Sequence, residues 1–250
     1  MTGGPLHGQV VVVTGGGGGI GSAICEICAT AGASLVITYN QDEAKARRLV
    51  ERLPGRQHLV VRAPVDDSSM LRQLAEQVAG HFGRLDVLVN NAGITQPVPH
   101  DDLESLDDTL IDHIFRVNWR GAFAAVRAFK PLLAAGTGGL VINISSVAGQ
   151  TGIGSNVAYC ASKAAMDAMT KSLARALAPQ IRVVSVAPGW VEGDYAKRMD
   201  PAILEEQRQK TPLKRIAQPQ DVGQAVLAVA TMLTFTTGSI IPVDGGRPLN

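Results

Sequence analysis

The sequence has few aromatic residues, no block of basic residues and no long apolar run. Aromatic residues make up only 4% of the chain, which argues against a surface that stacks nucleic-acid bases. With a net charge of +1, neither nucleic acid nor an anionic membrane is an expected partner. The most apolar late stretch, residues 225–235, is too short to cross a bilayer, and the N-terminus lacks the pattern of a signal peptide. We therefore expect a cytoplasmic protein that binds neither nucleic acid nor a membrane.

The chain contains only three cysteines, an odd number that suits a reducing compartment better than a disulfide framework. Cys25 and Cys28 form a Cys-x-x-Cys pair, but they lie inside an expected helix rather than at the N-terminus that lowers thiol pKa values. We interpret them as buried small residues and not as a redox pair. No spacing of His, Cys or Glu is typical of a metal site, so no metal is expected.

Apolar residues make up 46% of the sequence, enough for a substantial core, and no linker marks a boundary, so we predict one domain over residues 1–250. Short Val/Ile-rich runs alternate with helical patterns, which is typical of parallel strands buried on both faces. The predicted strands are residues 9–13, 33–38, 58–62, 85–89, 140–144, 181–187 and 239–243, and the longest predicted helical region is 103–133. The pattern predicts an α/β fold, a Rossmann-type doubly wound parallel sheet of about seven strands with helices on both faces.

A glycine-rich turn follows the first predicted strand. Residues 14–21 read Thr-Gly-Gly-Gly-Gly-Gly-Ile-Gly and lead into the first predicted helix. Glycine tolerates positive φ and lets a pyrophosphate approach the free N–H groups at a helix start. The position between a strand and a helix favours dinucleotide binding over a merely flexible turn.

Tyr159 and Lys163 are four residues apart in a segment that is predicted to begin a long helix, with Ser155 or Asn156 as its cap. On a helix both side chains share one face, about 6 Å apart along the axis. Tyrosine ionises near pH ~10, so its pKa must fall before it exchanges protons at neutral pH, and a nearby ammonium lowers it. Because the same spacing also arises by chance, the pair alone does not establish a site.

Further motifs follow in order along the chain. Asn-Asn-Ala-Gly occurs at residues 90–93 and Pro-Gly at residues 188–189, while Asn118 and Ser146 precede the Tyr-x-x-x-Lys pair. Together with the glycine-rich turn, these motifs make the whole chain resemble the short-chain dehydrogenase/reductase family, and within it the 3-oxoacyl-[acyl-carrier-protein] reductases.

The resemblance implies an NAD(P)(H)-dependent oxidoreductase that interconverts a carbonyl and a secondary alcohol, with a 3-oxoacyl thioester or related ketone as the expected substrate. Tyr159 would exchange the proton, Lys163 would lower the pKa of Tyr159 and hold the nicotinamide ribose, and Ser146 would orient the substrate oxygen. Asn118, the fourth catalytic residue, would anchor a water linking the lysine to solvent. The implied cofactor-binding residues are Gly15, Gly17, Gly18, Gly19, Ile20, Gly21, Tyr39, Asn40, Val65, Asn91, Ala92, Gly93, Tyr159, Lys163, Pro188, Gly189 and Val191.

Two features bear on the choice of cofactor. The second strand ends at Tyr39 and Asn40, where NAD-preferring relatives carry an acid, so NADP(H) is favoured. The chain has Gly17–Gly18 where NADP-preferring relatives often have Ser and Arg, which leaves only Lys45 or Arg47 as a cation for the phosphate. NAD(H) therefore remains an alternative.

Residues next to the catalytic strand ends are predicted to line the substrate pocket, and the segment 190–216 is predicted to close over the substrate. The predicted pocket residues are Ile94, Thr95, Ser146, Gln150, Ile153, Tyr159 and Trp190. The alternative functions are an alcohol dehydrogenase that acts on a sugar, polyol or steroid, and a non-catalytic dinucleotide sensor. The resemblance also implies a homotetramer formed through the helix that carries Tyr159 and the last strand, with a dimer as the alternative.

Overall fold

The computed structural model describes residues 3–55, 57–136, 138–193, 196 and 199–249, and within them seven parallel strands form one sheet. The strand order is β3-β2-β1-β4-β5-β6-β7. The strands are β1 (Val10–Val13), β2 (Ser34–Tyr39), β3 (His58–Arg62), β4 (Val87–Asn90), β5 (Gly139–Ile144), β6 (Ile181–Pro188) and β7 (Ile240–Val243). The predicted doubly wound α/β fold is confirmed, and strand ends differ from the prediction by two residues or fewer.

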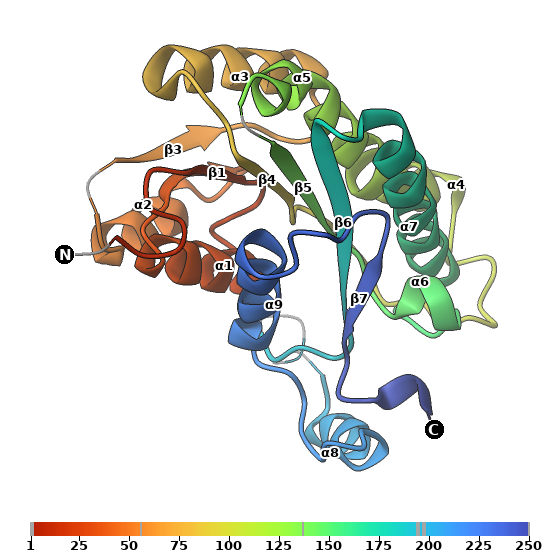
Figure 1. Ribbon diagram of the computed structural model, residues 1–250. Helices are drawn as coiled ribbons and strands as arrows, with labels where there is room; N and C mark the ends of the chain where they lie inside the picture. The colour runs from red at the N-terminus through yellow and green to blue at the C-terminus, as the bar shows by residue number, and fades with distance from the viewer. Residues whose placement is uncertain (1–2, 56, 137, 194–195, 197–198, 250) are drawn as a thin grey trace.

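Helices cover both faces of the sheet (Figure 1). One face is packed by α1 (Gly19–Thr30), α2 (Glu43–Arg52) and α9 (Pro219–Thr231), and the other by α3 (Ser68–Phe82), α5 (Ala122–Ala134) and α7 (Val157–Leu177). The remaining helices are α4 (Asp108–Phe115), α6 (Ala148–Thr151), α8 (Pro201–Lys210) and the 3₁₀ helix η3 (Arg247–Leu249). No helix of the described residues is long and apolar enough to span a bilayer.

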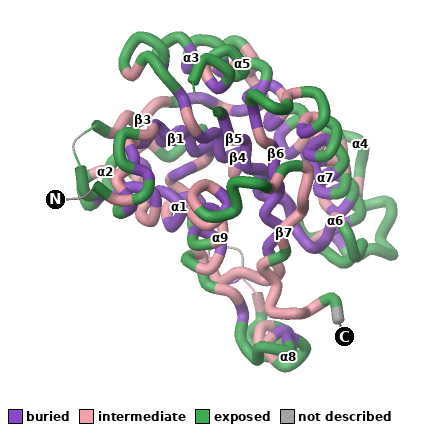
Figure 2. The backbone as a smooth tube through the Cα atoms, viewed as in Figure 1, coloured by how far each residue is buried: buried purple, intermediate pink, exposed green. Residues whose placement is uncertain are grey.

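The run of four valines in β1 serves two separate cores. Val11 and Val13 pack with α1 and α9, whereas Val10 and Val12 pack with α3 and α5. All four side chains are at most 3% exposed, because successive residues of a strand point to opposite faces and both faces are covered. Figure 2 shows the resulting buried centre and the exposed outer surfaces of the helices.

The strand order reverses between β1 and β4, which defines where a ligand can bind. After β3 at the sheet edge the chain returns to place β4 on the other side of β1. The segments that leave the carboxyl ends of β1 and β4 therefore diverge and open a crevice. The glycine-rich turn follows β1, and residues 90–93 follow β4, so both motifs lie at this crevice.

The predicted helical region 103–133 is wrong at its start and is not one regular helix. Helix α4 begins at Asp108, because the Asp107 carboxylate caps it by accepting from the Leu110 N–H at 2.7 Å. A π-helical segment, η1 (Arg116–Gly121), separates α4 from α5. Such segments are rare and often lie at functional sites. Here the π segment carries Asn118.

The two-sided core predicts unequal effects for two leucine substitutions. Leu133→Ala on α5 removes a fully buried side chain and should lower the free energy of unfolding by about 2–5 kcal/mol. Leu103→Ala is the matched control, since that side chain is 70% exposed and its loss should change stability by less than about 0.5 kcal/mol. Denaturant unfolding monitored by circular dichroism measures both. Equal effects would contradict the described packing.

Candidate active site

Helix α7 is fixed at its first turn by Asn156. The Asn156 side chain is fully buried, and its Oδ1 accepts from the Tyr159 N–H at 2.6 Å. Its Nδ2 donates to the carbonyl of Gln96 at 2.7 Å, which ties the helix start to the segment after β4. Because one side chain makes both contacts, the position of Tyr159 relative to the β4 crevice is set by the cap.

Lys163 lies one turn further along α7 and is only 5% exposed. Its Nζ donates to the carbonyl of Ile144 at the end of β5 at 2.8 Å, and lies 5.7 Å from the centre of the Tyr159 ring. Burial lowers the pKa of Lys163 to about 8, an effect that the negative charge of Asp167 partly opposes. The ammonium is therefore still the main form at neutral pH, beside the phenol.

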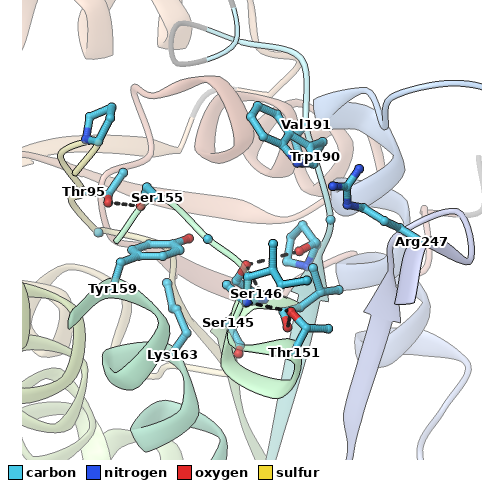
Figure 3. A pocket seen from close by; sticks show the side chains of 18 of the residues that line it. Thr95, Ser145, Ser146, Thr151, Ser155, Tyr159, Lys163, Trp190, Val191 and Arg247 are labelled. Atoms are coloured by element: carbon cyan, nitrogen blue, oxygen red, sulfur yellow. Dashed lines mark hydrogen bonds between the residues drawn. The ribbon is translucent and has the colours of Figure 1, made fainter. Parts of the chain in front are cut away.

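Ser146 follows the last residues of β5 and reaches the same cavity as Tyr159 (Figure 3). Its Oγ accepts from the Ala148 N–H at 3.2 Å and donates to the carbonyl of Pro188 only at 3.5 Å. The second distance is at the upper limit of a hydrogen bond, so the Ser146 proton is weakly held. The hydroxyl can turn toward a ligand without breaking a strong bond.

Asn118 holds the π segment against the loop after β4. Its Oδ1 accepts from the Ile94 N–H at 2.8 Å, and its Nδ2 donates to the carbonyl of Ile94 at 3.0 Å and to Ser162 Oγ at 3.1 Å. Both amide protons of this fully buried side chain are thus used within the protein. A Cβ at Gly93 would lie 3.3 Å from Asn118 Oδ1 and 3.7 Å from Lys163 Nζ, so Gly93 permits the close approach of these groups.

The glycine-rich turn and the β4 loop are bonded to each other. Thr14 Oγ1 accepts from the N–H groups of Asn91 and Ala92 at 3.0 and 3.1 Å, and Asn91 Nδ2 donates to the carbonyls of Thr14 and Gly15. A Cβ at Gly21 would lie 2.5 Å from the carbonyl oxygen of Gly15, so only glycine fits there. Helix α1 has no side-chain hydrogen bond at its N-cap, so its first N–H groups can receive an anion.

A cavity of about 490 Å³ lies along this turn and adjoins the cavity that holds Tyr159, which is about 1070 Å³. The residues that line both are Ile20, Asn91, Gly93, Ile94 and Val191. An extended ligand can therefore run from the glycine-rich turn to Tyr159 and Lys163. Of the sequence-predicted cofactor residues, the smaller cavity contains Gly15, Gly18, Gly19, Ile20, Gly21, Tyr39, Asn40, Val65, Asn91, Ala92, Gly93 and Val191, and the larger contains Tyr159, Lys163, Pro188 and Gly189.

Three sequence-predicted site residues line neither cavity: Asn118, which is fully buried, Gly17 and Gln150. Gly17 lies against α2, where a Cβ would be 3.4 Å from the backbone nitrogen of Ala46. Gln150 lies on the short helix α6, and its neighbour Thr151 lines the substrate cavity in its place. The other predicted pocket residues, Ile94, Thr95, Ile153 and Trp190, line the larger cavity with Ser146 and Tyr159. Within the predicted substrate segment 190–216, residues 194, 195, 197 and 198 lie outside the described residues.

Sequence reasoning missed a cation, Arg62, that lies next to the smaller cavity at the ends of β2 and β3. Arg47 is engaged by Glu43 at 2.6 Å, and Lys45 also has a partner. Arg62, which pairs with Tyr39 in the β2–β3 register, donates from Nε to the carbonyl of Asn40 at 3.1 Å. The parallel pairing of the two strand ends is the signal that could have found it.

The cysteines behave as buried apolar residues. Burial is the main reason that the pKa of Cys25 lies well above its usual value, and it raises the pKa of Cys28 to about 12. Both therefore remain thiols and form part of the core under β1, as expected. Among the described residues, no group of three or more His, Cys, Asp or Glu side chains is placed to hold a metal ion.

Comparison with known proteins places this site in a family. A family model described as enoyl-(acyl carrier protein) reductase matches residues 15–247. The 3-oxoacyl-[acyl-carrier-protein] reductase FabG of Thermotoga maritima is 35% identical over 246 residues, covering 96% of this chain and 98% of the relative.

Two solved structures have the same fold. One is a short-chain dehydrogenase/reductase described as glucose/ribitol dehydrogenase from Brucella melitensis, with a TM-score of 0.89 and 28% identity, covering 96% of this chain and 97% of the other. The second is a 7α-hydroxysteroid dehydrogenase complexed with NADH and 7-oxoglycochenodeoxycholic acid, with a TM-score of 0.90 and 30% identity, covering 96% and 94%. This chain, with its Tyr-x-x-x-Lys pair at the carboxyl edge of a doubly wound sheet, belongs to the short-chain dehydrogenase/reductase family of oxidoreductases.

Proposed function

We propose that this protein reduces the ketone of a 3-oxoacyl thioester or a related compound to a secondary alcohol, and catalyses the reverse reaction when the alcohol is supplied. The observation that carries the proposal is the meeting of Ser146 and Tyr159 in one cavity, with the buried Lys163 cation beside the phenol. A 3-oxoacyl reductase among the relatives supports this substrate class.

The crevice residues fit a nicotinamide dinucleotide. The uncapped start of α1 suits the pyrophosphate, and the glycines at positions 15 and 21 leave room for its approach. The residues that would hold the nicotinamide half line the larger cavity together with Tyr159 or the smaller cavity next to it: Asn91, Ala92, Gly93, Pro188, Gly189 and Val191. When bound, the nicotinamide supplies or accepts the hydride.

The protein's own part of the reaction is the transfer of one proton. Ser146 donates its weakly held hydroxyl proton in a hydrogen bond to the substrate oxygen, which orients the carbonyl. Tyr159 gives its phenolic proton to that oxygen as a hydride reaches the carbonyl carbon. Lys163, anchored on Ile144, stabilises the phenolate that remains, because an opposite charge favours the ionised form. Asn118 acts indirectly, because it bonds the loop after β4 through Ile94 and helix α7 through Ser162. That Asn118 also anchors a water stays a prediction.

NADP(H) is the proposed preferred cofactor. No carboxylate ends β2, and Arg62 donates to the carbonyl of Asn40, a residue that lines the smaller cavity, so its guanidinium is available to a 2′-phosphate at this end. NAD(H) is the alternative, since a structural relative is complexed with NADH.

A steroid or polyol alcohol is the second candidate substrate. The larger cavity, about 1070 Å³, is at the upper end of volumes typical of small-molecule sites and has room for a polycyclic ketone. A 7α-hydroxysteroid dehydrogenase and a glucose/ribitol dehydrogenase are among the structural relatives. A non-catalytic sensor is a weaker candidate, because dinucleotide binding alone does not require the phenol, hydroxyl and ammonium.

A homotetramer in the cytoplasm is the proposed state, with a dimer as the alternative. Met232 and Phe235, just before β7, are 78% and 106% exposed, as expected for apolar residues that a second copy covers. The free, buried cysteines suit a reducing compartment.

Replacing Tyr159 by Phe tests the proton transfer. Because Phe keeps the ring but lacks the proton, kcat for ketone reduction should fall by about 10²–10⁴-fold while cofactor affinity stays within about threefold. Stopped-flow absorbance of the reduced cofactor gives the rate, and fluorescence titration gives the affinity. Unchanged turnover in the variant would contradict the assigned role of Tyr159.

Replacing Arg62 by Gln tests the cofactor preference. Wild type should bind NADPH more tightly than NADH, and the variant should lose about tenfold or more in NADPH affinity with little change for NADH, because one charge-assisted contact to the 2′-phosphate is lost. Arg72→Gln removes an exposed arginine on α3 as the control. Equal or tighter NADH binding by wild type would refute the NADP(H) assignment.

A further inference from the structure

The substrate cavity has a strongly biased charge. Its charged lining residues are Lys163, Lys210 and Arg247, and no Asp or Glu of the described residues lines it. The proposed proton transfer uses only Lys163. Figure 3 shows that Arg247 reaches the cavity on the side of Trp190, across from Tyr159. The far side of the cavity therefore carries cations for which the reaction itself provides no role.

Arg247 has an unused donor. Its Nη1 is buried and has no hydrogen-bond partner among the described residues. A buried donor without a partner is unfavourable, so such groups are rare unless a ligand or water completes their hydrogen bonding. Arg247 begins the 3₁₀ helix η3 and is held there by its backbone N–H, which donates to the carbonyl of Asp244 at 3.3 Å.

Gln207 also lines this cavity and has a second unpaired polar atom. Its side chain is 7% exposed, and its Oε1 is buried without a partner among the described residues. A carboxamide has an acceptor and two donors, and their assignment interchanges by a half-turn of the side chain. Gln207 can therefore donate to an anionic ligand as readily as it can accept.

One carboxylate, that of Glu206, lies near the Arg247 side of the cavity, and it is shared with Lys210. Glu206 is the carboxylate whose charge raises the pKa of Arg247, against the larger effect of burial that lowers it. The Glu206 carboxylate is paired with Lys210 at 2.5 Å, and both side chains are more than half exposed to solvent. The single charge of Glu206 is therefore shared between Lys210 and Arg247, and these two cations together outnumber it on this side of the cavity.

We propose that Arg247 and Gln207 form a subsite for a carboxylate on the substrate, so that the enzyme acts on oxo acids and hydroxy acids in preference to neutral ketones and alcohols. The planar guanidinium matches the two oxygens of a carboxylate, and a partly enclosed site strengthens the charge-assisted bonds. The carboxylate belongs to the part of the substrate that lies away from the carbonyl, because Arg247 and Tyr159 approach the cavity from opposite sides. This inference rests on the proposed ketone reduction.

The turnover test uses linear oxo acids of increasing chain length, each compared with its own primary amide. For the best-fitting length, wild type should prefer the acid by about 10- to 100-fold in kcat/KM, and Arg247→Gln should reduce this acid-to-amide ratio to about one. Gln207→Glu, a near-isosteric change that adds a like charge, should also disfavour the acid. Arg208→Gln is the control: it removes a charge from α8 at a residue that pairs with Glu205 and does not line the cavity.

A binding test separates this inference from the proposed function. Calorimetric titration of octanoate and octanamide into wild type and Arg247→Gln needs no turnover. Tighter binding of octanoate to wild type, lost in the variant, supports the subsite even if no ketone is reduced. Equal binding of acid and amide by wild type overturns it even if ketones are reduced. A parallel loss of NADPH affinity in Arg247→Gln also overturns it, since Arg247 would then hold the cofactor.

Discussion

The hydrogen bond from the Lys163 ammonium to the carbonyl of Ile144 is the interaction around which the site is arranged. It places a cation, only 5% exposed, at the carboxyl end of β5 and fixes it at 2.8 Å. A buried charge is unfavourable unless it is hydrogen-bonded, so the surrounding structure must keep helix α7 in a fixed position against the end of β5. Gly149 permits this, because a Cβ there would lie 2.7 Å from the backbone of Lys163.

Two buried asparagines, Asn156 and Asn118, connect α7 to the segment after β4 by hydrogen bonds. Asn156 ties the first turn of the helix to Gln96, and Asn118 ties Ser162 to the loop after β4 through Ile94. That loop is in turn bonded to the glycine-rich turn through Thr14. The crevice at the glycine-rich turn and the residues around Tyr159 are thus joined through the loop after β4 by hydrogen bonds at both of its ends.

Local patterns were enough to predict the strands, the glycine-rich turn and the shared face of Tyr159 and Lys163, because each depends on residues close in sequence. The π segment was not predictable in this way. It depends on Gly121, where a Cβ would lie 2.7 Å from Val65 Cγ2, a contact between distant parts of the chain. Thr151, and not the predicted Gln150, lines the cavity because of the way α6 is oriented. A helix of four residues is too short for the sequence pattern to show which side faces the cavity. Gln207 and Arg247 belong to separate elements without a motif, so only the folded structure brings them to the substrate cavity.

In the proposed reaction the Lys163 cation makes Tyr159 a proton donor, and the pH dependence of ketone reduction tests this role most directly. Burial lowers the pKa of Lys163 to about 8, so its charge is present below that pH and is lost as the pH rises through it. For wild type, kcat/KM for ketone reduction should therefore fall about tenfold per pH unit above about pH 8. The same measurement on Lys163→Met should give a low rate without that decline. A wild-type rate that stays constant to about pH 10, or an identical decline in Lys163→Met, would contradict the account.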